Sequence, residues 1–185
     1  MLTNLHVSET MLAALPGEAG SVTALVIQFS RIPGEPGRPT QLEHFRRIIR
    51  QVSSAFGGVT ADLGENRMLT LFPAQPIRLA LRAALTLRVR LDKLSREEVI
   101  DKRPTYRIGI GLHTGMAQPA DCLEAGVLEA ANLSTLNQQA PFPALFVSEE
   151  MVRALPEANG YHVHDLGVVD VPEQPRPLAV FAVMR

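Results

Sequence analysis

The stretch Tyr106-Arg107-Ile108-Gly109-Ile110-Gly111-Leu112-His113-Thr114-Gly115 decides how this sequence is interpreted. Its apolar residues alternate with glycine and polar residues, a period of two that predicts a buried β-strand. The glycine at its end predicts a turn after the strand. By itself the stretch indicates only a strand inside a sheet, so the fold class depends on the segments around it.

Working outward from this strand, the pattern predicts alternating strands and helices. Residues 22–29 form a β-branched apolar run that is typical of a central strand. Residues 40–43 match a capping box, and apolar residues at helical spacing follow it. Further strands are expected at 59–63, 67–72, 144–147, 161–165, 166–171 and 178–183, and further helices at 76–94, at 124–138 and directly after Ser148. The order β-α-β-β-α-β predicts an α+β fold, a ferredoxin-like split βαβ core with C-terminal strand extensions.

Length and composition suit a single folded domain. The chain has 185 residues, of which 46% are hydrophobic and 20% charged, as in ordinary globular proteins. We expect an N-terminal helical arm at 1–20 and one domain at 21–185. The net charge is -1 and no basic stripe is present, which argues against a nucleic-acid partner. The arginines at 46, 47 and 50 fall on the polar side of a predicted helix and are expected to face solvent.

The single cysteine, Cys122, excludes an internal disulfide and a cysteine-rich zinc site. A cytoplasmic location fits this cysteine usage. Residues 1–14 lack the features of a signal peptide, and no window is apolar and long enough to cross a membrane. We therefore expect either a cytoplasmic protein or the cytoplasmic domain of a larger, membrane-anchored receptor.

Four segments, in their order along the chain, carry a family resemblance: 22–29, 57–66, 107–115 and Ala131-Asn132-Leu133. Together they resemble the catalytic domain of class III adenylate and guanylate cyclases over residues 22–183. The resemblance implies a class III nucleotidyl cyclase-like fold and a site shared between two paired domains. It also implies two Mg²⁺ or Mn²⁺ ions that offset charge on the attacking and leaving oxygens of a nucleoside triphosphate.

The residues that the family uses for chemistry are mostly replaced. The first metal-binding aspartate falls on Gln28, a neutral amide that binds Mg²⁺ poorly. The second falls on Glu65, which keeps the charge. Asn132 matches the family asparagine that orients the nucleotide. Leu136 stands where an arginine stabilises the transferring phosphate, and Leu136 cannot donate a hydrogen bond.

The base-reading positions are also lost, because they fall near Pro172 and Ala125. The segment 115–125 is short for the family's dimer arm. The leading hypothesis is therefore an inactive cyclase homology domain without a cofactor, acting in signalling, ligand sensing or pairing with itself or another cyclase-like domain. The alternative is a divergent active cyclase that uses Mg²⁺ or Mn²⁺, held by Glu65 with Asp62 and a backbone carbonyl.

The remaining candidates favour ordinary structural roles. His162 and His164 alternate on a strand and face the same side, but no third metal ligand is evident. His113 is expected to be part of the scaffold. Cys122 has no base near it in the sequence, so a reactive thiol is not expected. The proline- and glycine-rich loop at 33–39 lacks the pattern of a phosphate-binding loop.

Overall fold

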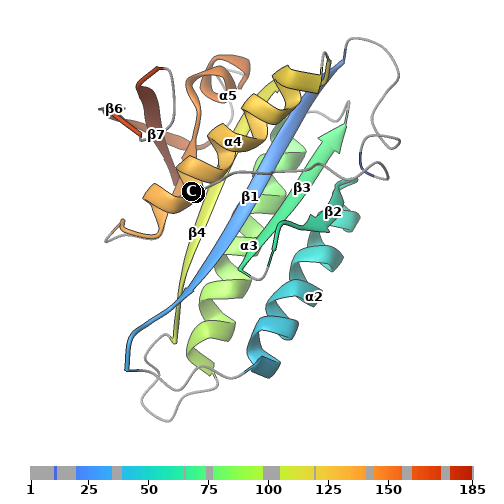
Figure 1. The fold of residues 1–185 in the computed structure, drawn as a ribbon, viewed down its shortest axis with the longest axis vertical. Coiled ribbons are helices and arrows are strands. Elements are labelled where there is room, and N and C mark those ends of the chain that lie inside the picture. Colours follow the sequence, from blue (N-terminus) through green and yellow to red (C-terminus); the bar gives the residue numbers. More distant parts are fainter. Residues whose placement is uncertain are drawn as a thin grey trace.

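The fold is described from a computed structural model (Figure 1). The structure describes residues 11, 20–34, 39–64, 66–73, 77–97, 105–118, 120–140, 144–155, 160–171 and 176–184. Apart from Met11 and Gly20, the expected N-terminal arm lies outside the described residues.

The strands form one seven-stranded sheet in the order β2-β3-β1-β4-β5-β7-β6. The elements are β1 (Ser21–Arg31), α2 (Pro39–Ala55), β2 (Val59–Asp62), β3 (Arg67–Pro73), α3 (Ile77–Glu97), β4 (Tyr106–Met116), α4 (Ala120–Asn137), β5 (Leu145–Val147), α5 (Glu149–Ala154), β6 (His162–Val169) and β7 (Leu178–Met184). Strand β3 lies between β1 and β2, which makes the split βαβ arrangement, and β4 pairs with the other edge of β1. The expected α+β fold is confirmed.

Helices cover both faces of the β3-β1-β4 region, as Figure 1 shows. Alternate residues of β1 point to opposite faces, so Leu25 and Ile27 join the core beneath α2 and α3, whereas Ala24 and Val26 pack toward α4. Gln28 follows the same alternation as Ala24 and Val26. The α4 face of the sheet therefore carries the side chain that the sequence analysis placed at the first metal position.

The glycines of the opening stretch allow α4 to lie directly on β4. A Cβ atom added at Gly109 would overlap the carbonyl oxygen of Ser134, and one added at Gly111 would overlap that of Ala130. The even-numbered residues of the same strand, Ile108, Ile110 and Leu112, are apolar and belong to the opposite core. The alternation of glycine with large apolar residues thus builds a flat surface for a helix on one face and a core on the other.

Among the described residues from 20 onward, the predicted elements are confirmed except at the C-terminal end. Residues 161–171 were expected to form two strands, but β6 is one strand with an irregular register between Asp165 and Val168. Gly167 adopts a φ of 89°, and its N–H donates to Asp165 Oδ1 at 2.8 Å. This local bond and the left-handed glycine make a bulge within the strand rather than a turn between two strands.

Candidate functional site

The side chain of Gln28 is held by two neighbours on the α4 face of the sheet. Its Oε1 accepts a hydrogen bond from Arg67 Nε at 2.9 Å and lies 2.9 Å from the Thr135 hydroxyl, which donates to it. Arg67 is the residue opposite Gln28 in the β1–β3 ladder, and Thr135 projects from α4. The atom that would have to bind a metal is therefore already engaged by protein donors.

The charge at this position is also unfavourable for a cation. The guanidinium of Arg67 is half-buried, and burial lowers its pKa from the ordinary value, although an arginine stays protonated at neutral pH. A permanent positive charge thus occupies the position beside Gln28 Oε1. The described residues here do not fit the divalent ions that the family resemblance implies.

Helix α4 carries three of the positions at which the family resemblance implies contacts with the nucleotide. Asn132 is buried, with 6% of its surface exposed, and its side chain has no hydrogen-bond partner among the described residues. Asn132 lies three residues before Thr135, so both are on the helix face turned toward β1. Leu136 instead packs into the apolar cluster beneath β5 and β7, and Ala125 is exposed to solvent.

Glu65 and Pro172 lie outside the described residues, so the second metal position and one base-reading position stay predictions. Asp62, the partner of Glu65 in the active-cyclase alternative, is already ion-paired. Its carboxylate lies 2.6 Å from Arg50 Nη2 and 3.5 Å from Arg46 Nε. Two residues of the arginine cluster in α2 thus have an anionic partner at the end of β2, rather than facing solvent alone.

Arg67, Thr135 and Gln138 contact the Gln28 position without having been predicted from the sequence. Gln138 Nε2 donates to the backbone carbonyl of Gln28 at 3.0 Å. An arginine at the start of a strand and polar residues at the end of a helix carry no distinctive local pattern. The only signal was the register of the predicted hairpin, which sets Arg67 near Gln28 once β1 and β3 are paired.

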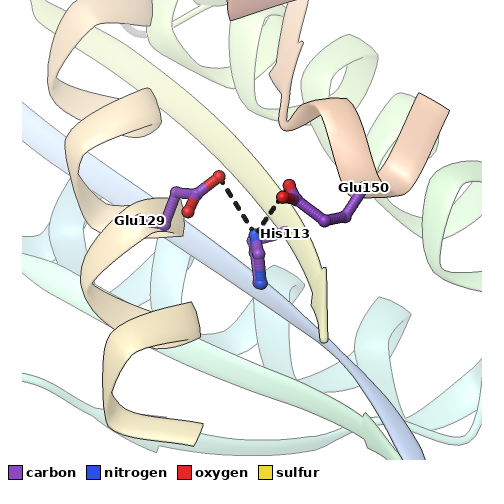
Figure 2. A group of neighbouring side chains, drawn as sticks. All are labelled: His113, Glu129 and Glu150. Atoms are coloured by element: carbon purple, nitrogen blue, oxygen red, sulfur yellow. Dashed lines mark ion pairs between the residues drawn. The ribbon is translucent and has the colours of Figure 1, made fainter. Parts of the chain in front are cut away.

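A second polar cluster surrounds His113, which had been assigned to the scaffold. Figure 2 shows His113 of β4 between Glu129 of α4 and Glu150 of α5. His113 Nδ1 lies 3.1 Å from Glu129 Oε1 and 3.8 Å from Glu150 Oε2. By contrast, His162 and His164 are exposed, and no third metal-ligating side chain joins them within the described ranges.

Comparisons of the sequence with protein-family models and with curated proteins give no match. Solved structures do match. The adenylyl cyclase CyaB from P. aeruginosa superposes with a TM-score of 0.71 at 12% identity, covering 91% of this chain and 95% of that one. An adenylate/guanylate cyclase/hydrolase from Silicibacter pomeroyi gives a TM-score of 0.70 at 21% identity, covering 91% and 99%. The guanylyl cyclase Cya2 gives 0.65 at 16% identity, covering 91% and 94%.

The chain therefore has the fold of adenylyl and guanylyl cyclase catalytic domains along nearly its whole length. At these identities the similarity establishes the fold and leaves the chemistry to be argued from the residues. In the described part of the chain, none of the helices is long and apolar enough to cross a membrane.

Proposed function

We propose that this cyclase-like domain has lost catalysis and acts as a cytoplasmic signalling module that pairs with itself or with another cyclase-like domain. The observation that carries the proposal is the occupation of Gln28 Oε1 by Arg67 and Thr135. A side chain that is neutral, hydrogen-bonded and adjacent to a guanidinium is a poor metal ligand. Without a metal ion at this position, one of the two cations that would offset charge on the attacking and leaving oxygens is lost.

The repulsion between Arg67 and a metal ion at Gln28 can be estimated from Coulomb's law. A divalent ion bound to Gln28 Oε1 would lie about 4 Å from the Arg67 guanidinium, where even two unit charges repel by about 4 kcal/mol at an effective dielectric constant of 20. Leu136 adds a second loss, because no hydrogen-bond donor replaces the family arginine. Removing one electrostatic contributor typically costs about a hundred- to a thousandfold in rate, so several losses remove useful turnover, even without additivity.

Incubation of the purified domain with ATP or GTP and Mn²⁺ or Mg²⁺ tests this proposal directly. We expect cyclic AMP and cyclic GMP at the rate of the buffer blank, measured by mass spectrometry, while an active cyclase in the same buffer serves as the positive control. Turnover well above the blank that Glu65→Ala abolishes would instead establish the divergent-cyclase alternative.

Restoring a carboxylate at position 28 is expected not to restore metal binding. In Gln28→Asp, the new carboxylate faces Arg67 and forms an ion pair with it, so the guanidinium satisfies the charge that a metal would need. Isothermal titration calorimetry should show that this variant binds Mn²⁺ as weakly as the wild type does, or not at all. The double variant Gln28→Asp, Arg67→Ala is the control that removes the competing cation, and tighter Mn²⁺ binding is expected in it alone. Mn²⁺ binding in Gln28→Asp as tight as in the double variant would contradict the proposal that Arg67 prevents metal binding.

A ligand-sensing role has its own supporting observation in Asn132, a largely buried residue whose side-chain amide has no hydrogen-bond partner among the described residues. Thermal-shift measurements with nucleotides, with and without Mg²⁺, distinguish this role from a pure interaction role. A shift that Asn132→Ala removes supports nucleotide sensing. No shift with any nucleotide, together with a dimer in light scattering, supports an interaction module.

A further inference from the structure

The cluster of His113, Glu129 and Glu150 gathers three metal-ligating side chains from three different elements. They come from β4, α4 and α5, and one donor atom from each lies within 4.8 Å of the others. The Gln28 position is separate from this cluster, and its residues are not shared with it. We propose that His113, Glu129 and Glu150 form a binding site for a divalent transition-metal ion of the zinc type.

The burial of His113 favours a ligand over a solvated histidine. Only 9% of the residue is exposed, and its Nδ1 atom is buried with no partner in hydrogen-bonding geometry. Glu129 Oε1 approaches Nδ1 to 3.1 Å, but the contact does not have hydrogen-bonding geometry. A buried ring nitrogen without such a partner is costly, whereas a metal between the donors would satisfy it.

The neighbouring glycines hold the imidazole in place. A Cβ atom at Gly115 would lie 2.8 Å from His113 Nε2, and one at Gly126 would lie 2.9 Å from its Cδ2. Any side chain at either position would therefore displace the ring. With that edge packed against glycine, Nδ1 is the nitrogen that turns toward the two carboxylates (Figure 2).

The spacing of the donors suits a small cation. A tetrahedral ion with bonds of about 2.0–2.2 Å sets its donors roughly 3.3–3.6 Å apart. The observed separations from Nδ1, 3.1 Å to Glu129 and 3.8 Å to Glu150, bracket that range. Glu150 is half exposed and can adjust its rotamer, and water would complete the coordination.

The chemistry of the donors selects the class of ion. Neither glutamate pairs with a lysine or arginine among the described residues, so no fixed cation competes with a metal ion for the two carboxylates. Mg²⁺ and Ca²⁺ prefer sites built from oxygen alone, whereas an imidazole with two carboxylates suits zinc and related ions. A bound ion would tie α5 to α4 across the end of β4.

The test uses untagged protein stripped with EDTA and titrated with ZnCl₂ by calorimetry. We expect one Zn²⁺ per chain at this site, and a rise in melting temperature of about 5–10 °C when the free ion is a hundred times its dissociation constant. Glu129→Gln and Glu150→Gln should each weaken binding at least about tenfold, and long-range ¹⁵N spectra should show the Nδ1 resonance of His113 moving on addition of metal.

Matched control variants distinguish Zn²⁺ binding at this site from Zn²⁺ binding elsewhere on the protein. Glu124→Gln and Glu149→Gln remove exposed carboxylates from the same two helices, and the His162→Ala, His164→Ala double variant removes the exposed histidine pair. All three should bind Zn²⁺ like the wild type. The proposal is overturned if the protein binds no Zn²⁺ below millimolar concentration, if Glu129→Gln and Glu150→Gln bind normally, or if the histidine-pair variant abolishes binding.

Discussion

Gly111→Ala is expected to destabilise the folded domain by more than about 3 kcal/mol, a large share of the roughly 5–15 kcal/mol that holds a typical domain together. The added Cβ atom would overlap the Ala130 carbonyl oxygen, and it would also meet the Ser134 backbone nitrogen and the Leu133 side chain. Two of these three neighbours are backbone atoms of a helix, so they cannot move aside as a flexible side chain does. The helix would have to lift from β4, which exposes part of the core beneath it.

Urea unfolding followed by circular dichroism measures this effect, together with the soluble yield of each variant. Arg107→Ala is the matched control, because Arg107 lies on the same strand with its side chain exposed. Its unfolding free energy should stay within about 0.5 kcal/mol of the wild type. A Gly111→Ala protein within 1 kcal/mol of the wild type would show that α4 does not lie directly on β4.

Asn137→Ala is expected to cost about 2–4 kcal/mol, through the loss of hydrogen bonds rather than of packing. Asn137 is buried at the end of α4, where its Oδ1 accepts from the Ile110 N–H at 2.9 Å and its Nδ2 donates to the Ala144 carbonyl at 3.0 Å. Its Oδ1 also lies 3.3 Å from Arg88 Nη1. Truncation leaves a backbone donor of β4 and a backbone acceptor before β5 without their partner.

Two further variants refine this prediction under the same urea assay. Asn137→Asp keeps the acceptor for Ile110 but loses the donor to Ala144, so its stability should fall between those of Asn137→Ala and the wild type. Gln139→Ala changes an exposed residue two positions later and should have little effect. A loss below 1 kcal/mol in Asn137→Ala would mean that water replaces both hydrogen bonds.

Much of the fold was predictable because its signals are local. The alternation of glycine and apolar residues at 107–115 and the Ser148 N-cap each depend on neighbours within one strand or one turn, whereas α2 begins at Pro39, one residue before the expected capping box. The bulge in β6 was not predictable in the same way. Asp165-Leu166-Gly167 is equally suited to a turn, and only pairing with β7 keeps it inside a strand.

For the candidate sites too, residue types were predictable from the sequence, whereas contacts between distant segments were not. The sequence alone predicted, through its resemblance to the cyclase family, that Gln28 and Leu136 stand where that family has residues used for chemistry, and this assignment stays a prediction. Only the tertiary structure decided that Arg67 and Thr135 engage the Gln28 side chain. Likewise, only the structure brought His113, Glu129 and Glu150 together from β4, α4 and α5. The physical reason is that such contacts depend on strand register and on how a helix packs across a sheet, and both are set by the whole core rather than by any short segment.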